Sequence, residues 1–247
     1  MQQVGKHCWC SPKSGIILAE SIWKNVHVPD SDYKFLQMRD PYNRVVSMFL
    51  NKIVDIDVRH LADVKRERWV PWIDVPDPYD DINSRAEVYK NYLTSQGQGC
   101  YRLPLDPNKN LLDYTFRDFV YDVLSKINVE TWFDPHFALQ TRFFFTSTAE
   151  ITFDDVVLLE KLPEAYALPA QKLGIELDLD AEKLKVAGRV GDKVDIDGPF
   201  HEWTVRQWWD LGASPDPKNY GSFYTEAIMN RVYNLYKSDF DLISQAS

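Results

Sequence analysis

A strand followed at once by a helix is predicted between residues 33 and 54. The segment DYKFLQM, residues 32–38, is largely apolar and predicts a buried strand. Asp40 is a good N-cap and Pro41 a good first helical residue, so we expect a helix from Pro41 to about Val54. This helix is amphipathic. Its polar side holds Asp40, Asn43, Arg44, Ser47 and Asn51, and its apolar side holds Val45, Val46, Phe49, Leu50 and Ile53.

The residues before this pair predict a similar unit. Residues 6–15, KHCWCSPKSG, indicate a short strand that ends in a tight loop, and residues 16–25, IILAESIWKN, have helical spacing. The chain therefore begins strand, loop, helix, strand, helix. This order favours an α/β fold with a parallel sheet and right-handed crossovers.

The rest of the chain predicts further elements and no linker, so we expect a single domain over residues 1–247. Residues 176–220 are expected to be loop-rich. The predicted elements are helices at 84–95, at 111–127 with Thr115 as N-cap, at 168–175 and at 224–243, and a third buried strand at 154–162.

Composition restricts the class of ligand. Hydrophobic residues make up 45% and charged residues 26% of the chain, as in ordinary globular proteins. The net charge of -9 makes the chain a poor general binder of nucleic acid or anionic membrane. An anionic ligand must therefore be bound by a local cluster of basic groups. The aromatic residues are expected mainly in the core.

The cysteines and the hydropathy bear on the compartment. Cys8, Cys10 and Cys100 have no metal-ligand spacing, and their odd number favours reduced thiols. No apolar run reaches about 18 residues, which predicts no membrane span. The N-terminus lacks a secretory pattern. If the chain is complete, we expect a cytoplasmic protein; if an N-terminal anchor was removed, the compartment is open.

Arg39 and Ser47 form the first candidate site. Ligands of parallel α/β sheets bind beyond the carboxyl ends of the strands, where Arg39 is expected. The helix that follows presents free N–H groups there, and Ser47 adds a hydroxyl. Together these groups suit one phosphate dianion. The alternative is that Arg39 pairs with a nearby Asp and that Ser47 simply lies on a helix.

The loop SPKSG forms the second candidate site. It also joins a strand to a helix, and Lys13 adds a positive charge. It is not the nucleotide-hydrolase loop, because the pattern GxxxxGK[ST] is absent. Two anion sites on successive strands predict a ligand with two separated anionic ends.

Several segments, taken in order, resemble the PAPS-dependent sulfotransferases, in particular the carbohydrate (family 2-like) branch. The most specific segment is RDPYNRVVS at 39–47, after PKSG at 12–15. The resemblance continues through TFRDFVYDVL, DPHFALQ, FDDVVLLEKLPE, LGI and VYNLYKSDFDLI. Residues 55–110 and 176–220 do not match clearly.

The resemblance implies a P-loop-like parallel β-sheet flanked by helices, of the sulfotransferase type. It also implies PAPS (3′-phosphoadenosine 5′-phosphosulfate) as cosubstrate, a hydroxyl of a carbohydrate or small molecule as acceptor, and no metal. Arg39 and Ser47 would bind the 3′-phosphate, and Lys13 would stabilise the leaving group. The 5′-phosphosulfate would be held by Ser11, Pro12, Lys13, Ser14 and Gly15.

Three departures from the family pattern bear on the site. No hydroxyl follows Gly15 at Ile17 or Leu18, the connection from the first helix to the RDP strand is short, and HFALQ lacks the family's proline. The short connection leaves the catalytic base open. We rank His136 first, ahead of His60 and Glu20; the alternative is that His136 caps or packs a loop.

Two other functions remain open from the sequence. One is a degenerate member of the family that binds PAP or a glycan without turnover. The other is a P-loop-like phosphotransferase, weakened by the missing GK[ST]. For Trp203, Trp208 and Trp209, stacking on sugar rings competes with core packing, which we expect for at least two of them.

Overall fold

The computed structural model describes residues 35–55, 81–95, 102–132, 136–141, 153–161, 167–173 and 193–245. The chain divides into two compact units that alternate along it. The first comprises Met1–Asp40, Ala138–Leu184 and Lys237–Ser247, and the second comprises Pro41–Phe137 and Lys185–Tyr236. The predicted first strand, loop and helix lie outside the described residues. The single domain over residues 1–247 stays a prediction.

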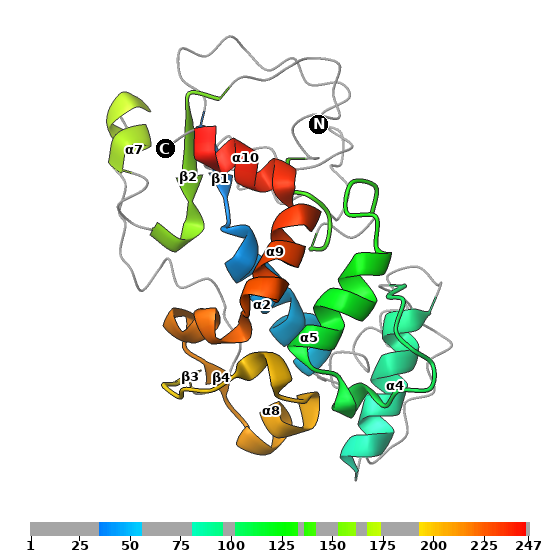
Figure 1. Cartoon of the computed structure of the whole chain (residues 1–247). Coiled ribbons are helices and arrows are strands. Elements are labelled where there is room, and N and C mark those ends of the chain that lie inside the picture. The colour runs from blue at the N-terminus through cyan, green and yellow to red at the C-terminus, as the bar shows by residue number, and fades with distance from the viewer. Residues whose placement is uncertain are drawn as a thin grey trace, which may run out of the picture. The chain divides into compact units, whose positions relative to one another are not determined.

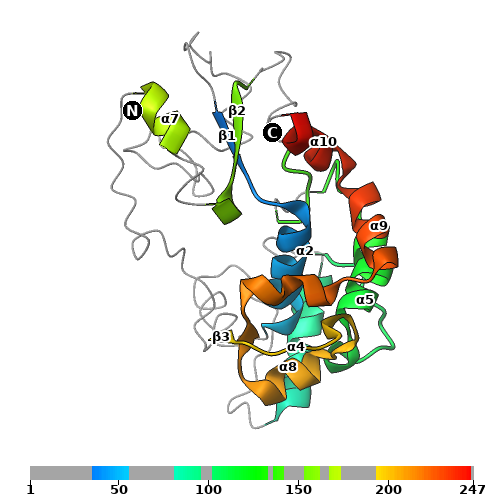
Figure 2. The ribbon, with the colours of Figure 1, turned by 60° about the vertical axis from the view of Figure 1, so that its left-hand side comes forward.

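The first unit contains a parallel pair of strands, as predicted. β1 (Phe35–Met38) and β2 (Asp155–Leu158) lie side by side, with Phe35 opposite Asp155 and Met38 opposite Leu158 (Figures 1 and 2). Leu36 and Met38 are buried and pack against β2 and α10 (Lys237–Gln245). A 3₁₀ turn, Leu159–Lys161, follows β2 directly, and α7 spans Ala167–Leu173.

The strand predicted at 154–162 is shorter and less buried than expected. Only Asp155–Leu158 forms a strand, and Val157 is its one buried residue. The 3₁₀ turn that replaces the end of the predicted strand contains Glu160, which is important for the site.

In the second unit, α2 (Pro41–Phe49) contacts α9 (Glu226–Leu235) (Figure 2). It begins at Pro41 as predicted, and a π-helix, Leu50–Val54, continues directly from its end. The predicted apolar side is confirmed, because all five of its members are buried. Arg44 is the exception on the polar side: it is only 9% exposed, and its guanidinium carbon lies 5.7 Å from the ring centroid of Tyr236.

The helix predicted over 111–127 is several shorter turns. Its parts are a 3₁₀ turn at Leu111–Asp113, α5 at Phe116–Asp118, a π-helix at Phe119–Val123 and a 3₁₀ turn at Leu124–Lys126. The predicted N-cap is confirmed, because the Thr115 hydroxyl accepts the N–H of Asp118 and the Asp118 carboxylate accepts the N–H of Thr115. Hydrophobic periodicity marks the buried face of all these turns but does not distinguish their types.

The helix predicted at 84–95 is confirmed as α4 (Ile82–Thr94), which is capped by Asp81. The predicted loop-rich stretch, in contrast, contains a further helix, α8 (Val205–Leu211). Gly212 ends α8 with a left-handed φ of 66°. Two residues each form the parallel strands β3 (Lys193–Val194) and β4 (Ser214–Pro215), and a 3₁₀ helix spans Pro217–Phe223.

The predicted closing helix is two helices, α9 and α10. Tyr236 separates them, with φ −112° and ψ 25°. Its ring is fully buried in the second unit, and its hydroxyl donates a hydrogen bond to the carbonyl of Phe137 at 2.9 Å. No proline or glycine marks this break, so the helical pattern of the sequence predicted one continuous helix.

Aromatic side chains fill the core of the second unit, as expected. Phe49 and Phe116 meet edge to face at 5.5 Å between ring centroids, and Trp208 stacks on Phe223 at 5.6 Å. Such pairs add to the burial of apolar area. In the described part of the chain, no helix has the length and apolarity needed to cross a bilayer.

Candidate functional site

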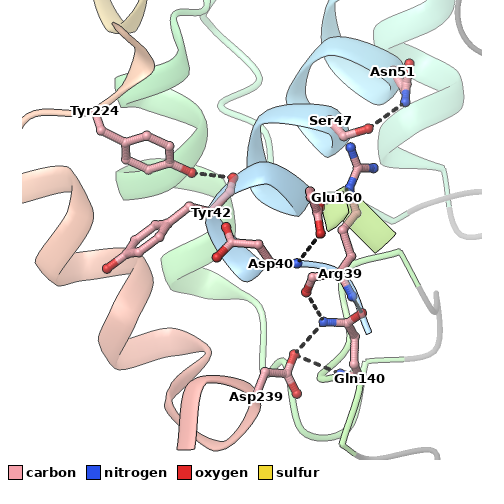
Figure 3. Close-up of polar contacts among 9 residues, drawn as sticks. All are labelled: Arg39, Asp40, Tyr42, Ser47, Asn51, Gln140, Glu160, Tyr224 and Asp239. Atoms are coloured by element: carbon pink, nitrogen blue, oxygen red, sulfur yellow. Dashed lines mark hydrogen bonds and ion pairs between the residues drawn. The ribbon is translucent and has the colours of Figure 1, made fainter. Parts of the chain in front are cut away.

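Arg39 follows β1 immediately and stands two residues before Pro41, where α2 begins. The parallel register also brings the turn after β2 to this end of the strands. There, Arg39 Nε donates to Glu160 Oε1 at 3.1 Å, and the N–H of Asp40 donates to Glu160 Oε2 at 3.0 Å (Figure 3). The sequence offered an Asp as the alternative partner of Arg39; the partner is Glu160, which only the strand pairing brings near.

Gln140 binds the main chain of Arg39. Its side-chain Oε1 accepts the Arg39 N–H at 2.9 Å, and its Nε2 donates to the Arg39 carbonyl at 2.8 Å (Figure 3). The backbone N–H groups of Gln140 and Thr141 donate in turn to the carboxylate of Asp239, at 3.0 and 2.9 Å. Asp239 is fully buried. The sequence had predicted no role in the site for Gln140, Thr141 or Asp239.

The guanidinium of Arg39 retains donors for a ligand. Within the described residues, its side chain is bonded through Nε alone. It is 32% exposed, and the carboxylate side chain of Glu160 is 25% exposed. The two terminal Nη groups form a planar fork that suits two oxygens of one phosphate. The end of β1 can therefore bind an oxyanion while the ion pair remains in place.

Ser47 lies on α2, in the second unit, and is half-buried. Its hydroxyl accepts a hydrogen bond from the Asn51 amide at 3.0 Å, one helical turn further on. The pairing agrees with the predicted polar side of the helix. The hydroxyl hydrogen of Ser47 can still be donated to a ligand. Joint binding of one phosphate by Arg39 and Ser47 stays a prediction.

His136 is exposed, in a turn whose following residues are buried. Phe137, Ala138 and Leu139 are at most 6% exposed, and the carbonyl of Phe137 accepts the Tyr236 hydroxyl. The backbone beside His136 is thus well anchored, while His136 itself is exposed. The structure does not test its role as a base.

The tryptophans pack as expected. Trp208 is buried between Phe200 and Phe223, and Trp203 lies 4.7 Å from it between ring centroids. Trp209 Nε1 donates to the carbonyl of Val54 at 2.8 Å. The rings of Trp203 and Trp208 are thus used for packing.

Several candidate residues lie outside the described part of the chain. They are Ser11, Pro12, Lys13, Ser14, Gly15, Glu20 and His60. Among the residues that the structure does describe, no three His, Cys, Asp or Glu side chains are grouped to hold a metal ion.

Comparison with known proteins gives one match. The model of the family described as "Sulfotransferase family" matches residues 18–243. This range includes Arg39, Ser47 and His136 and begins after the 11–15 loop. No curated protein and no solved structure matches the chain. The parallel strands agree with the α/β fold of that family, and a match over nearly the whole chain shows that this protein belongs to the sulfotransferase family, whose members transfer sulfuryl groups.

Proposed function

We propose that this protein transfers a sulfuryl group from PAPS to a hydroxyl of a carbohydrate or small-molecule acceptor. The observation that carries the proposal is the position of Arg39, in a chain of the sulfotransferase family. A partly exposed guanidinium fork follows a parallel strand and precedes the N-terminus of α2. Such strand ends are where α/β sheets bind anionic ligands.

The two anionic ends of PAPS match the two candidate anion sites. Arg39 and Ser47 bind the 3′-phosphate, the guanidinium through its Nη fork and the serine through its hydroxyl. The 5′-phosphosulfate is held by the P-loop-like loop of Ser11, Pro12, Lys13, Ser14 and Gly15. In an acidic chain, with net charge -9, these local groups and not the overall field select the anion.

The transfer itself needs a base and a group that stabilises the leaving oxygen. The acceptor oxygen attacks sulfur in line, its bond to sulfur forms, and the bond from sulfur to the bridging oxygen breaks. The imidazole of His136 accepts the hydroxyl proton. PAP leaves with the bonding electron pair, and the ammonium of Lys13 stabilises the charge that develops on the bridging oxygen.

The charge of the chain also restricts the acceptor. A long, highly sulfated polymer would need a basic groove, which the net charge of -9 does not favour. We therefore propose a neutral or weakly charged sugar, or a small hydroxyl metabolite.

A transfer assay with parallel binding measurements tests the proposal. The purified protein is incubated with radiolabelled PAPS and a panel of neutral sugars, short glycans and small alcohols, while calorimetry measures binding of PAP and of ATP with Mg²⁺. PAP binding with label transfer supports the sulfotransferase. PAP or glycan binding without transfer to any acceptor indicates a degenerate member, and binding of ATP with Mg²⁺ but not of PAP indicates a phosphotransferase.

A further inference from the structure

We infer that Gln140 and Glu160 are positioning residues that hold Arg39 ready for the 3′-phosphate, with Asp239 as their buried anchor. The inference rests on the proposed function, because it takes PAP as the ligand. Four segments far apart in sequence supply these residues: the end of β1, residues 140–141, the turn after β2 and the first turn of α10. All of them belong to the first unit.

Gln140 fixes the main chain. One side-chain amide accepts the N–H of Arg39 and donates to its carbonyl, as a neighbouring strand would. The orientation of the amide is determined, because its Nε2 also lies 3.5 Å from an oxygen of Asp239. A flipped amide would place an oxygen against both a carbonyl and a carboxylate. The main chain of Arg39 is therefore held in one orientation, which restricts where its side chain can point.

Glu160 fixes the side chain. Its two oxygens accept Arg39 Nε and the N–H of Asp40, so one carboxylate joins the guanidinium to the next peptide in the chain. Because this contact uses Nε, it restricts the plane of the guanidinium and leaves the Nη donors for a ligand. A side chain ordered before binding loses less rotamer freedom when the ligand arrives.

Asp239 holds Gln140 in place. It is 0% exposed, and it accepts the backbone N–H groups of Gln140 and Thr141. Multiple N–H donors allow a buried carboxylate to remain stable and well ordered. Asp239, on α10, therefore holds Gln140, and Gln140 in turn holds the main chain of Arg39.

Positioning and plain stabilisation make different predictions. A partly exposed Arg–Glu pair contributes little to folding. If its function is to orient Arg39, its loss should weaken recognition of the 3′-phosphate selectively, while stability and binding of the rest of the nucleotide change little.

The test uses Gln140→Met and Glu160→Ala, with affinities for PAP and for adenosine 5′-phosphate measured by calorimetry. Gln140→Met keeps the side-chain length and removes the amide. We expect the preference for PAP over adenosine 5′-phosphate to fall about tenfold in each variant, the size expected for a weakened charged hydrogen bond. Glu160→Gln, which keeps one acceptor oxygen, should give an intermediate loss.

Matched controls lie in the second unit. Gln207→Met removes the amide that caps α8, and Glu202→Ala breaks the exposed pair with Arg117, whose N–O distance is 3.2 Å. Both should keep the wild-type preference. An equal loss of preference in the controls overturns the inference.

A second measurement isolates the path through Arg39. In an Arg39→Ala background, Gln140→Met and Glu160→Ala should cause no further loss of PAP affinity, since the group that they position is gone. Losses that add to that of Arg39→Ala overturn the inference, and so does wild-type preference in the single variants. Absence of 3′-phosphate preference in the unaltered protein overturns the proposed function itself. If Gln140→Met does not fold, Glu160→Ala, at a partly exposed position, is used for both the preference measurement and the test in the Arg39→Ala background.

Discussion

At the scale of the residue, we propose that Arg39 combines two roles that the sequence offered as alternatives, an ion pair and a phosphate contact. A guanidinium has five N–H donors in a fixed plane, so one edge can form an ion pair while another binds a ligand. The structure places Glu160 on Nε, and the terminal fork stays available for an anion. The ion pair is therefore compatible with the proposed phosphate site.

We expect Arg39→Ala to weaken PAP binding by on the order of 1.5–3 kcal/mol, the contribution of a hydrogen bond to a charged group. Adenosine 5′-phosphate should lose much less, because it lacks the 3′-phosphate. Calorimetry with both ligands measures the difference. Arg117→Ala, which removes an exposed ion pair in the second unit, is the control. Equal losses for the two ligands would place Arg39 outside the 3′-phosphate site.

Substitutions of Lys13 and His136 should have different effects on the transfer rate and on PAP binding. Lys13→Ala should lower the transfer rate by about 10² or more, with a smaller loss of PAP affinity, since the leaving-group charge develops in the transition state. His136→Ala should lower the rate by roughly 10²–10⁴ and leave PAP binding intact.

The pH profile separates a catalytic from a structural His136. Only a neutral imidazole accepts a proton, so the wild-type rate should rise with pH through one ionisation that is absent in His136→Ala. A variant with a near-normal rate and an unchanged profile would make His136 structural and return attention to His60 and Glu20.

At the scale of the element, helix starts are specified by local chemistry. Thr115 begins α5 and Thr204 begins α8, each through a capping box. An isolated antiparallel bridge joins the two threonines, so both starts are also fixed to each other. Burial raises the pKa of Asp118, the partner of Thr115, but hydrogen bonds from Lys109 and Thr115 outweigh it and hold the pKa below its usual value.

Thr115→Ala should lower the free energy of unfolding by about 1 kcal/mol, because the N–H of Asp118 loses its acceptor. Urea denaturation followed by circular dichroism measures the change. Thr115→Ser, which keeps the hydroxyl, should retain most of the stability. A loss in the Ser variant as large as in the Ala variant would show that the methyl group, and not the cap, stabilises this helix start.

Asp81, the N-cap of α4, should contribute a pH-dependent stability. Backbone hydrogen bonds from Asn83 and Ser84 lower the pKa of Asp81 from 3.8 to about 2. Since the folded pKa is depressed, the contribution is fully present above pH 3.8 and is lost as the pH falls towards about 2. NMR titration of the Asp81 carboxyl carbon should give a midpoint near 2, and one near 3.8 would contradict the cap. Asp81→Asn, which does not titrate, should have a flatter dependence of stability on pH in this window.

At the scale of the whole molecule, the chain passes repeatedly between its two compact units. β1 belongs to the first unit and α2, which follows it, to the second. Arg39 and the three residues that bond to it or to its partner all belong to the first unit, although Gln140, Glu160 and Asp239 come from distant parts of the chain.

PAP at about 100 times its dissociation constant should stabilise the protein by roughly 2.7 kcal/mol, since the unfolded chain does not bind it. Differential scanning fluorimetry should show a higher melting temperature that depends on PAP concentration. Arg39→Ala should require more PAP for the same shift. A folded protein with no shift at millimolar PAP would count heavily against the proposed donor.

Features that depend on neighbours along the chain could be predicted from the sequence. Pro41 starts α2, Thr115 caps α5, and a largely apolar segment forms β1, because capping and local hydrophobicity act within a few residues. The order of strands and helices also predicted parallel pairing, and the RDPYNRVVS segment indicated the family.

Features that depend on packing between distant residues needed the tertiary structure: the break at Tyr236, the burial of Arg44 and the turn that ends β2. The tertiary structure also decided the partners of Arg39, because Gln140 and Glu160 lie about a hundred residues or more from it. Glu160 reaches Arg39 through the parallel pairing of β1 with β2, and Gln140 is held in turn by Asp239 of α10.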